Sequence, residues 1–206
     1  ERATRVAAGA RDVAGRAQPM TARRRTLVTG AAGFIGVLAA LALARRGDDV
    51  VALDDFDPYY DVALKEARAR ELARQPGIAL VRHDLAESDA TARLFADGAF
   101  THVVHLAAQP GVRYSLSNPG AYLRNNVDAF GNVLEGCRHG RVAHLVYASS
   151  SSVYGATHTV PFSEDQPTDT PVSLYAATKK ANELMAYSYA HLFGLAATGL
   201  RFFTVY

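Results

Sequence analysis

The chain of 206 residues is long enough for one α/β domain with a sizeable core, but short for two full domains. Hydrophobic residues make up 49% of it and charged residues 20%, as in an ordinary globular protein. The formal net charge of +2 owes much to seven arginines within residues 1–25. No later basic stripe is interleaved with aromatic residues, so nothing in the sequence supports nucleic-acid binding.

The cysteine content and the apolar runs limit the cellular setting. Cys137 is the only cysteine, which excludes an internal disulfide framework and a cysteine-rich metal site and favours a reducing compartment, so we expect a cytoplasmic protein. The longest apolar run, residues 37–44, is too short to span a bilayer. Residues 1–25 are rich in arginine and lack an apolar signal core, which predicts a disordered extension, with an organellar transit peptide as an alternative.

From Thr26 onward, short β-branched runs alternate with longer helical patterns. Strands are predicted at residues 27–29, 50–53, 79–82, 102–106, 144–148 and 198–203, and helices at about 34–46, 60–75, 89–97, 119–138 and 173–193. Alternating strands and helices require crossover connections, which build a parallel sheet covered on both faces. We therefore expect one α/β domain with a doubly wound parallel sheet over residues 26–206.

The first predicted strand runs into a turn with the sequence Gly30-Ala-Ala-Gly33-Phe-Ile-Gly36, which opens a helix. Gly30 allows a tight turn, Gly33 lets the backbone approach a pyrophosphate, and Gly36 lets the helix pack close to the sheet. The N–H groups at the start of the helix are free to bind phosphate. Asp54 ends the second strand 18 residues after Gly36, where a carboxylate binds ribose hydroxyls. Together these features predict a dinucleotide site.

Acidic residues near this site bear on the cofactor. Asp54 and Asp55 would repel a 2′-phosphate and no arginine follows immediately, so NAD is expected rather than NADP. Asp84, after the third strand, is placed to meet the adenine ring, with a helix N-cap as the alternative. The histidines near the strands show no metal-ligand spacing, and no metal site is predicted.

Tyr175 and Lys179 stand four residues apart in a predicted helix, so both side chains lie on one face. An ammonium beside a phenol favours the phenolate and would draw the pKa of the tyrosine from about 10 toward neutrality, leaving a usable general base. The same spacing also occurs on solvated helix faces. The other motifs in the chain supply the context that favours catalysis.

With these motifs in view, residues 25–206 resemble the extended short-chain dehydrogenase/reductase family and, within it, the UDP-glucuronate 4-epimerases. The resemblance rests on Thr29-Gly-Ala-Ala-Gly-Phe-Ile-Gly36, Leu53-Asp-Asp-Phe-Asp-Pro-Tyr-Tyr-Asp61, His105-Leu-Ala-Ala-Gln-Pro-Gly-Val-Arg-Tyr-Ser115, Asn125-Asn126, Ser149-Ser-Ser-Ser-Val-Tyr-Gly155, Tyr175-Ala-Ala-Thr-Lys179 and Leu200-Arg-Phe-Phe-Thr-Val-Tyr206. It implies a Rossmann fold, NAD as cofactor, a UDP-sugar substrate, and a homodimer built on the Tyr175 helix with residues 119–138 as the second helix.

The motifs and the resemblance together give three sets of site residues. The catalytic set is Tyr175, Lys179 and Ser150. The cofactor set is Gly30, Gly33, Phe34, Ile35, Gly36, Asp54, Asp84, Leu85, Leu106, Ala107, Ala108, Gln109, Asn125, Ser149, Tyr175, Lys179 and Phe202. The substrate set is Arg113, Ser150, Ser151, Ser152, Tyr175 and Thr204.

The reaction that the resemblance implies is 4-epimerisation of a UDP-hexuronate, which converts UDP-glucuronate to UDP-galacturonate through a 4-keto sugar. Tyr175 would take the proton of the C4 hydroxyl while NAD takes the hydride, and the hydride would return on the other face of the sugar. UDP-glucose 4-epimerase and UDP-glucuronate decarboxylase remain alternatives. A 4,6-dehydratase is disfavoured because Ser151 and Ser152 stand where those enzymes carry Asp-Glu.

The position of Tyr206 raises an alternative of another class. Members of the family continue into Gly-Pro and a smaller C-terminal region that grips the nucleotide, so we expect this chain to lack that substrate region. Losing binding contacts far from the reacting atoms can lower the rate of the chemical step as well as the affinity for substrate. A truncated, non-catalytic NAD-binding module is therefore the second hypothesis.

Overall fold

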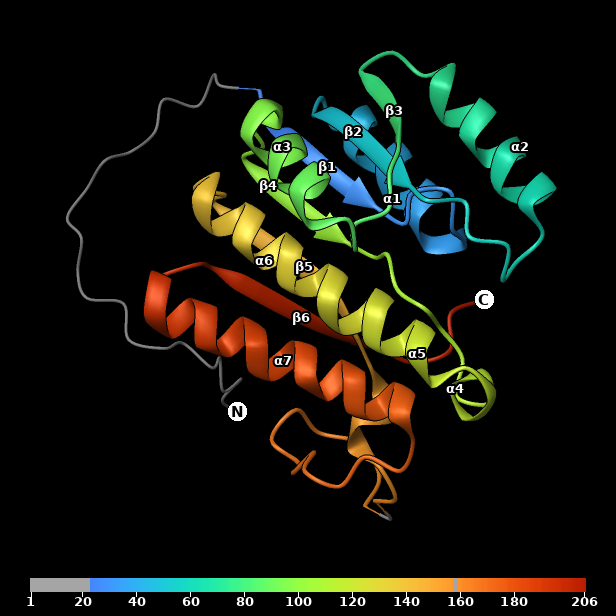
Figure 1. Ribbon diagram of the computed structural model, residues 1–206, viewed down its shortest axis with the longest axis vertical. Coiled ribbons are helices and arrows are strands. Elements are labelled where there is room, and N and C mark those ends of the chain that lie inside the picture. The colour runs from blue at the N-terminus through green and yellow to red at the C-terminus, as the bar shows by residue number, and fades with distance from the viewer. Residues whose placement is uncertain (1–22, 158) are drawn as a thin grey trace.

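A parallel sheet forms the centre of the molecule (Figure 1). The computed structural model describes residues 23–157 and 159–206. Its six strands are β1 (Arg25–Thr29), β2 (Asp49–Asp54), β3 (Ile78–Arg82), β4 (His102–His105), β5 (His144–Ser150) and β6 (Ala197–Phe202). They pair in the order β3-β2-β1-β4-β5-β6, and every pair is parallel. This order reverses direction between β1 and β4, where a Rossmann sheet opens a crevice for a ligand.

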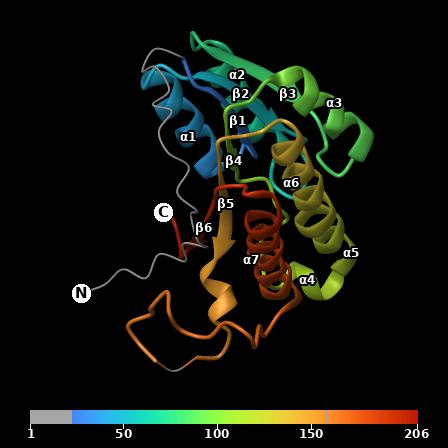
Figure 2. The ribbon, with the colours of Figure 1, turned by 90° about the vertical axis from the view of Figure 1, so that its left-hand side faces the viewer.

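Helices cover the sheet in two layers (Figure 2). The longer ones are α1 (Phe34–Arg45), α2 (Val62–Ala73), α3 (Ser88–Gly98), α6 (Ala129–His139) and α7 (Leu174–Phe193). Helix α1 packs Val37, Ala40 and Leu41 against alternate residues of β1 and β2. Helices α3, α6 and α7 pack on the opposite face around Phe130, Leu134 and Leu145. Alternate residues of the strands are therefore buried in two cores, one on each face of the sheet. The predicted doubly wound α/β fold is confirmed.

The predicted helix 119–138 is wrong in its middle. It is formed by α5 (Pro119–Tyr122), a π-helical stretch (Leu123–Asp128) and α6. A π-turn inserts an extra residue and weakens the regular ladder. Here the side chain of Asn182 donates to the backbone carbonyl of Asn126 at 2.6 Å, and the Asn126 side chain binds the backbone of Gln109. These long-range contacts hold a backbone shape that helical periodicity does not reveal.

Two short elements near the site also escaped the sequence pattern. Helix α4 (Tyr114–Ser117) follows β4, and a 3₁₀ turn (Ser151–Tyr154) follows β5. The turn is capped by Ser150, whose Oγ accepts a hydrogen bond from the N–H of Ser152 at 3.2 Å. The serine run is thus a capped turn rather than an irregular loop.

The predicted N-terminal extension, residues 1–25, falls outside the described residues except for its last three, and β1 already begins at Arg25. Cys137 is buried, and burial raises the pKa of its thiol to about 12, which makes it a poor nucleophile at neutral pH. Within residues 23–157 and 159–206, no helix is long and apolar enough to cross a membrane. The same residues hold no cluster of His, Cys, Asp and Glu suited to a metal ion.

Candidate active site

A cavity of about 880 Å³ opens at the carboxyl ends of the strands. Its lining joins the glycine turn after β1 to the ends of β2, β4, β5 and β6 and to the start of α7. Ligands of doubly wound sheets bind at this edge. The lining includes the predicted residues Gly30, Gly33, Phe34, Ile35, Gly36, Asp54, Asp84, Leu85, Leu106, Ala107, Ala108, Gln109, Asn125, Ser149, Ser150, Ser151, Ser152, Tyr175, Lys179, Phe202 and Thr204. The predicted Arg113 is exposed and is not part of this lining.

The glycine turn has no room for side chains. Gly30 has φ +68°, and a Cβ there would lie 2.7 Å from the amide nitrogen of Ala107. A Cβ at Gly36 would overlap the carbonyl oxygen of Gly30 and lie 2.8 Å from Cα of Ala31. Gly33 is the extended N-cap of α1, so the first N–H groups of that helix face the cavity mouth without a side-chain cap. Free N–H groups at a helix start suit a diphosphate.

Asp54 is buried at the end of β2 and is committed to several partners. One carboxylate oxygen accepts a hydrogen bond from the N–H of Ala32 in the glycine turn at 3.0 Å. The other accepts from the N–H of Phe56 at 2.9 Å and from the ammonium of Lys65 at 3.3 Å. Asp54 therefore fixes the glycine turn to β2. Lys65 was not predicted at this site, because it does not follow Asp55 directly in the sequence and reaches the carboxylate only from α2.

Asp84 also has partners within the protein. Its carboxylate accepts from the N–H of Ala86 at 2.9 Å and pairs with the guanidinium of Arg124 at 2.6 Å. The alternative prediction that Asp84 caps a helix is wrong, because the N-cap of α3 is Glu87. The Asp84 side chain instead binds Ala86, which lies between β3 and α3, and Arg124 of the π-helical stretch, and Asp84 still lines the cavity.

The end of β4 is held by buried polar contacts. The hydroxyl of Thr29 lies 2.8 Å from Nδ1 of His105 and accepts from the N–H of Ala107 at 3.1 Å. Burial, and secondarily the positive charge of Lys179, lowers the pKa of His105 to about 3, so the ring is neutral. His105 therefore has a structural role at the end of β4. These contacts set the path of residues 106–109 along the cavity floor.

Three side chains with complementary chemistry line the same cavity, at the end of β5 and the start of α7. Tyr175 and Lys179 come from the first turns of α7, whose N-cap Ser173 accepts from the N–H of Ala176 at 3.1 Å. Lys179 is only 3% exposed and donates to the carbonyl of Ala148 at 3.1 Å. Ser150 follows two residues later. An ammonium has three protons, so Lys179 keeps donors for a ligand.

Burial gives Lys179 a pH-dependent effect on stability. Desolvation lowers its pKa from 10.5 to about 8, so the unfolded chain binds its proton more tightly than the folded chain. Stability should therefore rise with pH between these two values, because there the unfolded state carries more protons. Between about pH 7.5 and about pH 9.5, we expect the free energy of unfolding of the wild-type chain to rise by about 2 kcal/mol relative to that of Lys179→Met. Urea denaturation of both chains at the two pH values measures this rise. The same difference in unfolding free energy at both pH values would contradict the prediction.

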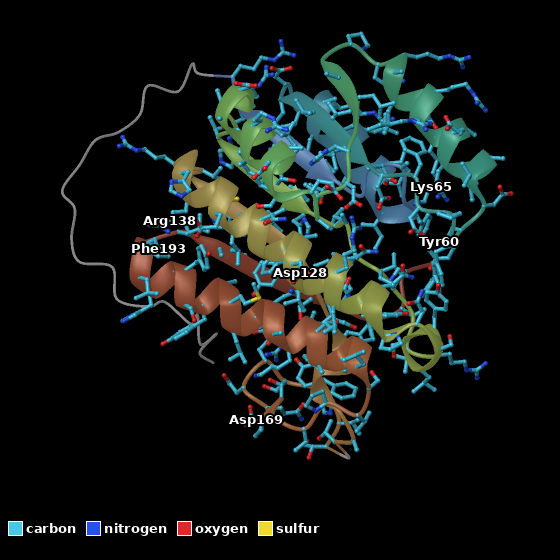
Figure 3. The ribbon with its side chains drawn as sticks, in the orientation of Figure 1. Tyr60, Lys65, Asp128, Arg138, Asp169 and Phe193 are labelled. Carbon is cyan, nitrogen blue, oxygen red and sulfur yellow. The ribbon has the colours of Figure 1, made fainter. Side chains whose placement is uncertain are left out.

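A group of tyrosines closes the side of the cavity next to Tyr175. The ring of Tyr122 lies edge-on to Tyr175 with centroids 6.1 Å apart, and its hydroxyl donates to the carbonyl of Pro110 at 2.8 Å. Tyr59, from the loop after β2, packs against Tyr114 at 4.9 Å and against Tyr60 at 4.8 Å. Tyr60 also lines the cavity, and Figure 3 shows it with Lys65 near the start of α2. The loop after β2 thus reaches across to the loop after β4.

The lining of the cavity suits the parts of a dinucleotide. The glycine cradle would be filled by any added Cβ, the start of α1 offers free N–H groups, and the cavity extends from this turn to Tyr175 and Lys179. A pyrophosphate at the helix start with a nicotinamide riboside directed toward α7 uses each of these features. The residues present therefore fit NAD.

Comparison with known proteins agrees with this fold and cavity. The model of the NAD dependent epimerase/dehydratase family matches residues 26–206, and the chain belongs to this family. Among its relatives, UDP-glucuronate 4-epimerase 4 of Arabidopsis thaliana is 54% identical over 181 residues, which cover 87% of this chain and 41% of that protein.

Solved structures of epimerases share the fold of this chain. The UDP-glucuronic acid 4-epimerase of Bacillus cereus, in complex with UDP-glucuronic acid and NAD, is 35% identical, with a TM-score of 0.81 over 88% of this chain and 57% of that one. The UDP-glucose 4-epimerase of Brucella ovis, in complex with NAD, is 30% identical, with a TM-score of 0.76 over 88% of this chain and 52% of that one. The chain spans about half the length of the relatives it matches.

Proposed function

We propose that this chain carries the NAD-binding and catalytic part of an NAD-dependent UDP-glucuronate 4-epimerase, which converts UDP-glucuronate to UDP-galacturonate. The observation that carries the proposal is that Ser150, Tyr175 and Lys179 line one cavity with the glycine turn. Two UDP-glucuronate 4-epimerases of Arabidopsis thaliana that are 54% and 55% identical to this chain support the uronate as substrate. Residues 26–206 are proposed to be the NAD-binding domain.

Each catalytic side chain has a role that its contacts allow. Bound NAD supplies a hydride acceptor and donor. Tyr175 is proposed to take the proton from the C4 hydroxyl and to return it to the same oxygen. The ammonium of Lys179 stabilises the phenolate and has donors left for the nicotinamide ribose. The Oγ of Ser150 accepts from Ser152, so its own proton is free to orient the reacting oxygen.

The 4-keto uronate is a β-keto acid and can lose CO₂. We propose that Ser151 and Ser152, both on the cavity wall, hold the carboxylate in the plane where the breaking bond overlaps poorly with the carbonyl. Thr204 is proposed to contact the hexose. Asp54, Asn125 and the residues at the ends of β4 and β5 are proposed to contact NAD, and Arg113 stays a candidate for the carboxylate or a phosphate.

Product analysis tests the function. The 206-residue chain is incubated with NAD and either UDP-glucuronate or UDP-glucose, and the sugar nucleotides are separated by chromatography. UDP-galacturonate is the expected product. A UDP-pentose would identify a decarboxylase, and turnover of UDP-glucose alone would identify the other epimerase. NADH binding without UDP-sugar binding or turnover would instead favour the NAD-binding module.

A homodimer in the cytoplasm is also proposed. Helix α7 exposes Leu184 and Tyr187 at 57% and 55%, on the face that also bears Ser188 and His191. Apolar side chains grouped on a helix beside α6 are suited to pack against a second copy. Leu184→Glu is expected to shift the chain toward a monomer in sedimentation velocity, and an unchanged sedimentation coefficient would contradict this surface. The single buried cysteine supports a reducing location.

A further inference from the structure

Strand β6 supplies part of the cavity although it stands at the edge of the described sheet. Its residues are half-buried or exposed. Phe202 at its end, and Phe203, Thr204 and Val205 directly after it, nevertheless line the cavity. An edge strand is held on one side only, so something else must fix its end if these residues are to meet a substrate.

A bidentate ion pair joins β6 to α7. Nε of Arg201 donates to one carboxylate oxygen of Glu183 at 2.9 Å, and its Nη2 donates to the other at 3.0 Å. The two side chains are only 22% and 16% exposed. Two parallel bonds between a guanidinium and a carboxylate fix orientation as well as distance. The pair therefore sets how β6 sits against the helix that carries Tyr175.

The same carboxylate holds β5. The hydroxyl of Ser149 donates to Glu183 at 2.6 Å, and Ser149 is the register partner of Arg201 across the β5–β6 pair. One turn earlier on α7, Lys179 donates to the carbonyl of Ala148. Helix α7 thus binds β5 at two consecutive residues, Ala148 and Ser149, immediately before Ser150.

Charge and packing support this arrangement. Burial acts to raise the pKa of Glu183, but the hydrogen bonds from Arg201 and Ser149 outweigh it and the pKa lies below its usual range. The hydrogen bond from Arg201 to Glu183 likewise raises the pKa of Arg201. The guanidinium also lies 4.9 Å from the ring centroid of Tyr154, in the turn that Ser150 caps. The ion pair is therefore charged on both sides at neutral pH.

We propose that Glu183 and Arg201 are positioning residues, which hold the Ser150–Ser152 turn and the segment 202–205 in register with Tyr175 and so form the sugar-binding half of the cavity. The part that concerns substrate rests on the proposed function. The glycine turn follows β1, which β4 separates from β5 and β6, so we expect loss of this clamp to weaken NAD binding less than sugar-nucleotide binding.

The test compares Glu183→Gln and Arg201→Lys with Glu135→Gln. Glu135 is a matched control because its carboxylate also joins α7 to a neighbouring element, α6, through a hydrogen bond from Tyr189, but it lies outside the cavity lining. In Glu183→Gln, amide hydrogen exchange of peptides covering 144–152 and 197–206 should rise about tenfold, since a charged hydrogen-bond pair is lost. Arg201→Lys keeps the charge but not the two parallel bonds, so a smaller rise is expected. Glu135→Gln should leave both peptides unchanged.

Ligand binding separates positioning from general destabilisation. Glu183→Gln is expected to weaken UDP-glucuronate binding by about tenfold while NADH affinity, measured by nicotinamide fluorescence, stays within about twofold. Wild-type exchange in both peptides would overturn the clamp, as would equal losses of NADH and UDP-glucuronate affinity. If the wild-type chain itself binds no UDP-glucuronate, the proposed function fails, and the exchange data alone decide the clamp.

Discussion

Tyr175→Phe is expected to lower the epimerisation rate by about 10²- to 10⁴-fold, the usual contribution of a positioned general base. The ring remains, so its edge-on contact with Tyr122 and the fold around it should survive. NADH affinity should stay within about twofold, because losing one hydroxyl leaves the glycine turn and Lys179 intact. Rates are measured by chromatography of UDP-glucuronate and UDP-galacturonate under single-turnover conditions.

The matched control is Tyr187→Phe. Tyr187 lies on the same helix, is 55% exposed and is absent from the cavity lining. Its loss of a hydroxyl should leave the rate unchanged. Wild-type turnover in Tyr175→Phe would remove this tyrosine from the mechanism, whatever the control shows.

Gly36→Ala should nearly abolish dinucleotide binding. The added Cβ would meet the carbonyl oxygen of Gly30 and Cα of Ala31, which are backbone atoms that cannot rotate away. The turn cannot shift away from this contact, because Gly30 already lies close to the backbone of Ala107. Overpacking of this kind destabilises by about 3 kcal/mol, and the displaced turn should weaken NADH binding by at least about 100-fold.

Gly131→Ala serves as the comparison for this prediction. It is also a helical glycine, in α6, but a Cβ there would meet only Cε of Met185 at 3.5 Å, an ordinary contact. Alanine favours a helix interior over glycine by about 1 kcal/mol, so this variant should be as stable as the wild type or more so. NADH titration and urea denaturation of both variants make the measurement. Equal NADH affinities for Gly36→Ala and wild type would contradict the role of the turn.

Local sequence signals were sufficient for the frame of the site. The strand and helix pattern, the glycine turn and the four-residue spacing of Tyr175 and Lys179 each depend on neighbours within one or two elements. Parallel strands leave their carboxyl ends at one edge, and in the structure the glycine turn and the Ser150 turn line the same cavity there. The family resemblance added the identity of the serines and the cofactor-lining residues.

Interactions between distant segments were beyond that reasoning. In the sequence, Lys65 and Glu183 stand within predicted helices and Arg201 within a predicted strand, and charge alone does not reveal their partners. Their pairings depend on strand register and helix rotation, which only packing fixes. The π-turn at Asn126 likewise could not be predicted from local sequence, because the carbonyl of Asn126 accepts a hydrogen bond from Asn182, 56 residues away.

The sequence by itself determined the doubly wound sheet and the residue types of the cavity, because alternation, glycine spacing and the Tyr175-Lys179 pair follow from local geometry. Only the tertiary structure decided which charges meet, since a guanidinium and a carboxylate pair according to their separation in space and the water excluded around them. That is why Asp54 is bound to Lys65 and Asp84 to Arg124, and why the turn at Ser150 is tied through Ser149 to Glu183.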